Sequence, residues 1–145
     1  MKEKLRVWTI GHSNRSADNF LELLNEHGIR VLVDVRSFPT SKIEHFKKEQ
    51  MERWLPEDGI SYVWLGKELG GYRRCGYKRH MRTKLFRQGT KQLLEIAKTK
   101  RSCAMCMEVN PKYCHRRFIS AHLERKGVQV IHIVEKGQQN LLTKF

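Results

Sequence analysis

Five short runs of hydrophobic residues alternate with amphipathic segments along this chain. The runs are nearly continuous and rich in β-branched residues, as expected of strands that are covered on both faces. They begin at residues 6, 30, 60, 102 and 128, and the best defined cover 6–10, 30–35, 60–65 and 128–134. Apolar residues at helical spacing predict helices between them, at 17–27, 49–55, 77–87, 90–99 and 114–126.

The regular alternation of strands and helices predicts an α/β fold with a mainly parallel five-stranded sheet and helices on both faces. The 145 residues are expected to form one domain, 1–145, with a polar tail at 135–145. The strand order 3-2-1-4-5 is the one that we predict. It places the first and fourth strands side by side, at the point where such sheets bind ligands.

Polar side chains follow three of the predicted strands where each strand ends. They are His12, Ser13, Asp34, Arg36, Cys106 and Glu108. Because the carboxyl ends of parallel strands share one edge of a sheet, we expect these residues to converge on one pocket. An alternative interpretation of Asp34 and Arg36 is a structural ion pair.

Cys114 lies near the start of a predicted helix, where free backbone N–H groups and the helix dipole favour negative charge. Arg116 and Arg117 would help to stabilise a thiolate there, so Cys114 is a candidate nucleophile. The same N–H groups are also suited to a phosphate-like anion, with Arg36 and Arg116 as clamps. His115 can exchange protons near neutral pH, and the candidate acid–base groups are His12, Asp34, Glu108 and His115.

The four cysteines are expected to be reduced thiols, because no secretion signal is visible. Cys103 and Cys106 are three residues apart on a strand and therefore point to opposite faces, which suits a shared metal poorly. A different metal set remains open, with mixed ligands that suit zinc or iron. It comprises Cys106, Glu108, Cys114 and His115. The residues do not identify an organic cofactor.

Positive charge is concentrated in one part of the chain. The formal net charge is +14, and the segment from Arg73 to Arg101 holds eleven Lys or Arg residues against one acidic residue, Glu95. This basic region predicts a nucleic acid or another polyanion as a partner, although a solvated helical surface is the alternative. No apolar run approaches the ~20 residues of a membrane-spanning helix, so we expect a cytoplasmic protein without membrane attachment.

Several motifs occur together in the order TIGHS (9–13), LVDVRSFPTS (32–41), GISYVWLGKELGG (59–71), CMEVNPKYCHR (106–116) and VIHI (130–133). In this combination, from about Val7 to Ile133, the chain resembles the domain of unknown function 488 family. The resemblance implies a compact α/β domain with an enzyme-like pocket, and it supplies neither a substrate nor a reaction. The matching positions are Gly11, His12, Ser13, Asp34, Arg36, Pro39, Ser41, Gly70, Gly71, Cys106, Glu108, Cys114, His115 and Arg116.

These observations favour an enzyme that acts on a phosphate-bearing substrate, such as a nucleotide or nucleic acid. Its candidate catalytic residues are Cys106, Glu108, Cys114, His115, His12 and Asp34, and its candidate anion-binding residues are Ser13, Arg36, Ser41, Gly70, Gly71 and Arg116. A non-catalytic nucleic-acid-binding module that uses the basic region is the first alternative. A metal-binding protein is the second.

Overall fold

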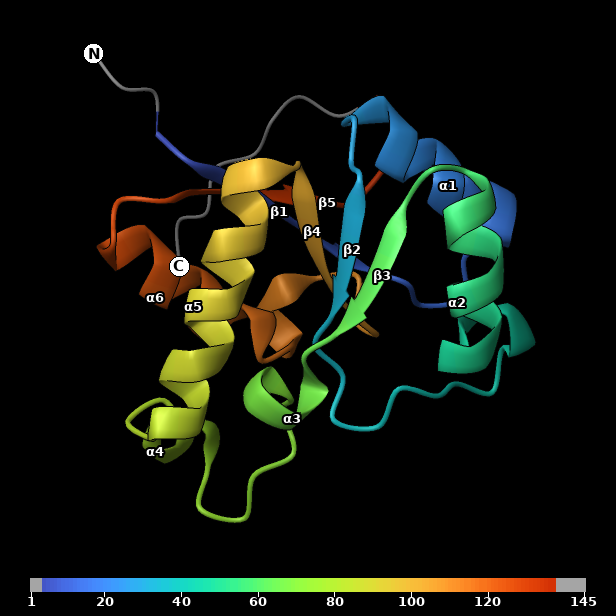
Figure 1. The fold of residues 1–145 in the computed structure, drawn as a ribbon. Coiled ribbons are helices and arrows are strands. Elements are labelled where there is room, and N and C mark those ends of the chain that lie inside the picture. Colours follow the sequence, from blue (N-terminus) through green and yellow to red (C-terminus); the bar gives the residue numbers. More distant parts are fainter. Residues whose placement is uncertain (1–3, 138–145) are drawn as a thin grey trace.

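Five parallel strands form a single sheet in the computed structural model, which describes residues 4–137 (Figure 1). The strands are β1 (Arg6–Gly11), β2 (Val31–Asp34), β3 (Ser61–Trp64), β4 (Ser102–Cys106) and β5 (Gln129–Ile133). Every pairing within the sheet is parallel, so the predicted α/β fold is confirmed. Residues 138–145 of the predicted polar tail lie outside the described residues.

The strand order is β3-β2-β4-β1-β5, and the predicted order 3-2-1-4-5 is therefore wrong. Strand β4 lies between β2 and β1, with Val31 paired to Ser102 on one side and Trp8 paired to Cys103 on the other. Both β1 and β4 are almost fully buried, so their hydrophobicity alone does not distinguish the two positions. As a result, the carboxyl end of β4 adjoins the ends of both β1 and β2.

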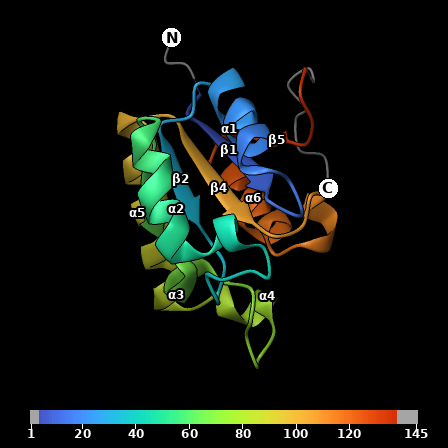
Figure 2. The ribbon, with the colours of Figure 1, turned by 90° about the vertical axis from the view of Figure 1, so that its right-hand side faces the viewer.

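Helices cover both faces of the sheet (Figure 1), and Figure 2 shows the arrangement turned by 90°. One face packs against α1 (Ala17–Glu26), α2 (Lys48–Glu57) and the 3₁₀ turn η1 (Glu44–Phe46). The opposite face packs against α3 (Gly66–Leu69), α4 (Tyr77–His80), α5 (Lys84–Thr99) and α6 (Arg116–Arg125). Within residues 4–137, no helix has the length and apolar character needed to cross a bilayer.

Side chains along each strand alternate between the two hydrophobic layers, as strand geometry requires. In β4, Cys103 and Met105 face the α1–α2 layer, whereas Ala104 and Cys106 face the layer of α3 to α6. Cys103 and Cys106 therefore point to opposite faces, as the sequence spacing predicted. Cys106 alone of the two is directed toward the start of α6.

Helix α5 differs from the prediction of two helices separated by Gly89. It runs unbroken through this glycine, and the break lies earlier, at Thr83, whose hydroxyl accepts a hydrogen bond from the N–H of Phe86. Gly89 serves close packing instead: a Cβ at this position would lie 2.5 Å from the Cβ of Glu68. The glycine therefore lets α3 approach α5 closely, and it does not end a helix.

Two other boundaries differ from the sequence-based assignment. Helix α2 continues through Pro56 to Glu57, because proline near a helix end removes only one backbone hydrogen bond. Helix α6 begins at Arg116, after a 3₁₀ turn, η2 (Pro111–Tyr113), so Cys114 precedes the helix. The short helix α3 lies in a segment to which the sequence analysis assigned no helix.

Candidate functional site

Two cysteine sulfur atoms meet where β4 ends and α6 begins. Cys106 and Cys114 are joined in a disulfide, so the expectation of four reduced thiols is wrong for this pair. Cys75 and Cys103 are free. The strand places Cys106 on the α6 face of the sheet, and the turn η2 folds back to bring Cys114 onto it. Cys106 is buried with 3% exposure, whereas Cys114 is only partly covered.

A histidine beside Cys114 is held in one orientation by a backbone carbonyl group just after β2. The Nε2 atom of His115 lies 2.8 Å from the carbonyl oxygen of Val35. Because a carbonyl only accepts hydrogen bonds, Nε2 carries the proton and Nδ1 presents a lone pair. Nδ1 lies 3.6 Å from the Sγ of Cys114. The arrangement matches the general pattern of a nucleophile, a base and a group that orients the base.

Burial keeps His115 neutral. It lowers the pKa of His115 from 6.5 to about 4, and the hydrogen bond to Val35 opposes that shift only in part. The ring packs against Gly71, where a Cβ would lie 2.6 Å from Nδ1. The ring of Tyr77 lies 5.5 Å away. The imidazole is therefore uncharged above about pH 5, and its Nδ1 can accept a hydrogen bond from the Cys114 thiol.

The backbone also contributes a hydrogen bond to Cys114. The N–H of Arg116, the first residue of α6, donates to the Sγ of Cys114 over 3.4 Å. The following N–H groups, those of Arg117 and Phe118, donate to the carbonyl oxygens of Cys114 and His115. The helix start therefore directs one N–H group at sulfur, where a hydrogen bond stabilises a thiolate.

A second group of predicted site residues lies on the other face of the sheet edge. Asp34 and Arg36 form a buried ion pair with a distance of 2.8 Å between Oδ2 and Nη2, and Tyr62 donates its hydroxyl to the same carboxylate. The Nε of Arg36 donates to Asp34, and its Nη1 donates to the carbonyl oxygens of Thr40 and Phe46. The guanidinium is thus enclosed by protein acceptors, which matches the structural ion-pair interpretation.

His12 belongs to this second group. It is buried, its ring stacks on Phe46 at 4.6 Å, and its Nδ1 donates to the carbonyl oxygen of Ser13. Its Nε2 accepts from Arg36 over 3.3 Å. Burial lowers the pKa of His12 from 6.5 to about 4. The residue is therefore a neutral, fully engaged packing element between β1 and the loop after β2.

Arg116 lies beneath the loop that connects β4 to η2. Its side chain is 1% exposed and donates to the hydroxyl of Thr9 and to the carbonyl oxygens of Glu108 and Val109. Burial lowers its pKa to about 10. In this position Arg116 fastens the loop onto β1, and its guanidinium faces protein atoms.

The remaining predicted positions have local structural roles. Ser13 has a positive φ of 42°, and its N–H donates to the carbonyl oxygen of Met107, so it extends the contact between the β1 and β4 ends. The hydroxyl of Ser41 accepts from the N–H of Ile43. Gly70 ends α3, where a Cβ would lie 2.2 Å from the hydroxyl of Ser37.

The alternative metal set of Cys106, Glu108, Cys114 and His115 is not assembled. The two sulfur atoms are bonded to each other, Glu108 is exposed, and Nε2 of His115 is engaged by Val35. In the described part of the chain, no group of three or more His, Cys, Asp or Glu side chains is arranged to hold a metal ion.

The sheet edge therefore separates the predicted site into two groups, one around Cys114 and His115 and the other around Asp34 and Arg36. The sequence reasoning did not identify Tyr62 or the carbonyl of Val35. The position of Tyr62 could have been inferred from the alternation in β3, since the residue paired with it, Leu32, faces the same layer as Asp34. Backbone groups such as the Val35 carbonyl leave no signal in a sequence.

Comparison with known proteins identifies one family. The family model described as "Domain of unknown function DUF488" matches residues 16–123. The match covers more than half of the chain, and the chain therefore belongs to this family, in agreement with its motifs. Neither the curated proteins nor the solved structures contain a significant match.

Proposed function

We propose that this member of the DUF488 family is a two-cysteine thiol–disulfide enzyme. Cys114 is the attacking thiol, Cys106 is the resolving thiol, and His115 is the base. One observation carries the proposal: the Sγ of Cys114 contacts both the Sγ of Cys106 and, at 3.6 Å, the Nδ1 of an oriented, neutral histidine.

The difference in burial between the two sulfur atoms supports this assignment of roles. Cys114 is partly exposed and receives a backbone hydrogen bond from Arg116, so it can meet a substrate as a stabilised thiolate. Cys106 is 3% exposed and cannot be the first to react with a bulky disulfide. Its contact with Cys114 suits it to the second, intramolecular step.

The chemistry needs only the substrate disulfide as oxidant. In the reduced protein, His115 accepts the proton of Cys114, and the thiolate attacks one sulfur of R–S–S–R′. The S–S bond of the substrate breaks, R′–S⁻ leaves and takes up a proton, and Cys114 forms a mixed disulfide with R–S. The Cys106 thiol then loses its proton and attacks the Sγ of Cys114. This step releases R–SH and forms the Cys106–Cys114 disulfide, and the reverse sequence oxidises a dithiol.

The expected cytoplasmic location stays a prediction and agrees with a redox role. Disulfides in reducing compartments are usually transient and catalytic, and structural disulfides are rare there. The two cysteines are close in the chain, with a sequence separation of 8. A short loop of this kind gives less entropic stabilisation than a long one, so a mainly structural purpose is the weaker explanation.

The hypothesis of a phosphate-bearing substrate draws less support from the same residues. Arg36 and Arg116, the expected clamps, direct their guanidinium groups at Asp34 and at backbone carbonyls. The N–H of Arg116 is directed at sulfur. A phosphate would have to displace these contacts, whereas a thiolate uses the N–H group as it stands.

The proposal is tested by trapping the mixed disulfide. Reduced protein is mixed with oxidised glutathione, and the adducts are measured by intact-mass spectrometry. In Cys106→Ser we expect one glutathione to accumulate on Cys114, because the resolving thiol is missing. Cys114→Ser should form no adduct at Cys106 on the same timescale, since that sulfur is buried.

Cys75 provides the matched control. It is exposed and free, so Cys75→Ser should lose only an ordinary surface thiol and should leave the rate at Cys114 unchanged. The proposal fails if Cys114 reacts no faster than Cys75, or if Cys106→Ser forms no stable adduct. His115→Asn, which removes the base, should slow the first step while the protein stays folded.

A nucleic-acid-binding module is the second candidate function. Of the eleven basic residues in 73–101, all except the partly covered Arg73 are exposed. Three of them, Arg87, Lys91 and Lys98, line a hollow of about 350 Å³ between α5 and the end of α6. Binding there predicts an affinity that falls steeply with salt. Lys91→Ala with Lys98→Ala should weaken it, and an unchanged affinity would exclude this face.

A further inference from the structure

All of the large hydrophobic side chains that are exposed within residues 4–137 lie at one edge of the sheet. They are Phe38, Trp64, Tyr72, Met107 and Tyr113, with exposures between 37% and 78%. Each lies at or shortly after the carboxyl end of β2, β3 or β4, three strands that are neighbours in the sheet. We call these five residues, four aromatic side chains and Met107, the aromatic rim. Isolated exposed hydrophobic residues need no explanation, but their confinement to one edge indicates a binding surface.

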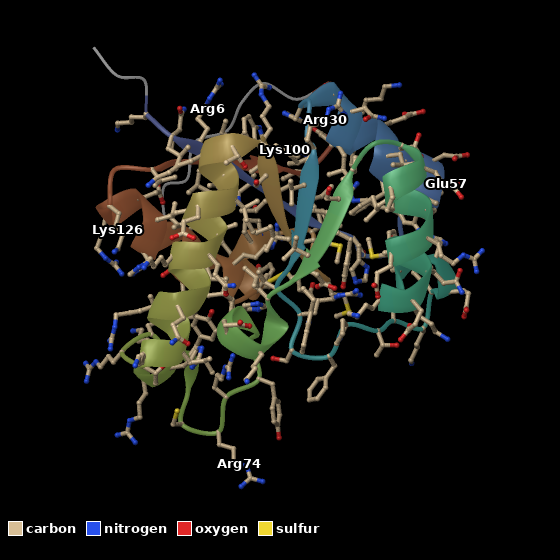
Figure 3. The ribbon with its side chains drawn as sticks, viewed as in Figure 1. Arg6, Arg30, Glu57, Arg74, Lys100 and Lys126 are labelled. Atoms are coloured by element: carbon tan, nitrogen blue, oxygen red, sulfur yellow. A yellow bond between two sulfur atoms is a disulfide. The ribbon has the colours of Figure 1, made fainter. Side chains whose placement is uncertain are left out.

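The rim is mixed with positive charge. The segments 35–43, 65–76 and 107–117, which contain four of its five members, carry five exposed Lys or Arg residues against one exposed acidic residue, Glu108. The five are Lys42, Lys67, Arg74, Lys112 and Arg117. Figure 3 shows Arg74 projecting from the end of the molecule at which β2 and β3 finish, with Arg30 and Lys100 at the opposite end.

We propose that the aromatic rim binds single-stranded nucleic acid. Its rings would stack on unpaired bases, and the surrounding Lys and Arg residues would contact the phosphates. This combination of exposed rings and interspersed positive charge is what sequence-tolerant single-strand binding requires. A duplex is disfavoured because its bases are already stacked on one another.

Two rings of the rim lie side by side on different loops. The rings of Phe38 and Tyr72 are 5.6 Å apart and tilted by 56°, and the two residues are 65% and 68% exposed. The backbone N–H of Tyr72 donates to the hydroxyl of Ser37, which fixes the two loops that carry these rings. A pre-formed platform lowers the entropic cost of binding.

The rim borders the reactive cysteine. Tyr72 follows Gly71, which packs on the ring of His115, and Tyr113 directly precedes Cys114. A bound strand would therefore pass beside the Sγ of Cys114. The binding itself involves no sulfur chemistry, so the inference stands independently of the proposed thiol–disulfide function.

The test is a fluorescence-anisotropy titration with labelled single-stranded DNA and RNA of about 12 nucleotides, within the site sizes known for such proteins. Tyr72→Ala and Tyr113→Ala should each weaken binding roughly 5- to 150-fold. Tyr113→Phe should bind like the wild type, whereas Tyr113→Leu should bind like the alanine variant, because leucine is apolar but cannot stack.

Three controls separate this surface from its alternatives. Arg74→Ala should weaken binding, and Arg30→Ala, at the opposite end of the sheet, should not. Cys114→Ser should bind the oligonucleotides with wild-type affinity. A loss of affinity in the tyrosine variants could then not be attributed to a loss of thiol activity. Lys91→Ala with Lys98→Ala should change binding less than Tyr72→Ala.

Several results would overturn the inference. One is unchanged affinity in both tyrosine variants. Another is tighter binding of a duplex of the same length, which would favour the α5 face. The third is a preference for an acidic peptide over the oligonucleotides, which would make the rim a protein-docking surface.

Discussion

Acidification from pH 7 to pH 5 should destabilise this protein through its buried histidines. Burial lowers the pKa values of His12, His115 and His132 from 6.5 to about 4. The unfolded chain binds protons on these residues below about pH 6.5, whereas the folded chain binds them only near pH 4 and below. Because the unfolded state holds more protons in this window, stability is lost as the pH falls through it. Above about pH 6.5 the three residues have no further effect.

The size of the effect follows from the shifts. At pH 5, a histidine with a folded pKa near 4 favours the unfolded state by about 2 kcal/mol. Three such residues together give about 5–6 kcal/mol, which is comparable with the whole stability of many domains. The pKa values of His27, His80 and His122 are also lowered by burial, so they act in the same direction.

Urea unfolding followed by tryptophan fluorescence measures this dependence at pH 7, 6 and 5. The midpoint should fall with pH while the slope of free energy against urea stays constant. His12→Asn removes one titrating group, so it should flatten the pH dependence by about a third whatever its effect at pH 7. Equal midpoints at pH 7 and pH 5 would refute the reasoning. NMR signals of His12, His115 and His132 that titrate near pH 6.5 would refute it as well.

Two substitutions test the two halves of the sheet edge. Gly71→Ala places a Cβ 2.6 Å from the Nδ1 of His115, so it should turn the ring away from Cys114. In the reduced protein, the alkylation of Cys114 by iodoacetamide should then be slower, with little change in the alkylation of Cys75. An unchanged alkylation rate would show that the ring position does not matter. Asp34→Asn leaves the buried Arg36 without its counter-charge and should cost about 3–5 kcal/mol in urea unfolding. A loss below about 1 kcal/mol would contradict a buried pair.

The strands could be predicted from the sequence because burial on both faces leaves a continuous apolar run. The first predicted strand, 6–10, differs from β1 by one residue. The order of the strands could not be predicted, since β1 and β4 are similarly buried and carry no mark of their neighbours. The predicted helix boundary at Gly89 was wrong for a related reason. A glycine that allows close packing and a glycine that ends a helix look the same in a sequence.

The position of the polar strand-end residues could be predicted from the sequence, but their division into two groups could not. They lie at one edge of the sheet, and their role as a functional site stays a prediction. Their division between two faces depends on where each strand ends. The guanidinium N–H groups of Arg36 are occupied partly by the carbonyl oxygens of Thr40 and Phe46. These acceptors are backbone atoms that the chain segment after β2 supplies, so no residue type in the sequence indicates them. The disulfide likewise depends on the turn η2, which the sequence analysis did not anticipate.

The error in strand order bears directly on the proposed chemistry. With β4 beside β2, the N–H of Val35 donates to the carbonyl of Met105, and its own carbonyl accepts from His115. A single residue, Val35, thereby connects the end of β4, which carries Cys106, to the histidine that adjoins Cys114. In the order 3-2-1-4-5, β1 would separate Val35 from β4, and His115 would lose this orienting acceptor. The arrangement around Cys114 on which the proposed chemistry depends therefore follows from the central position of β4, which the hydrophobic pattern did not reveal.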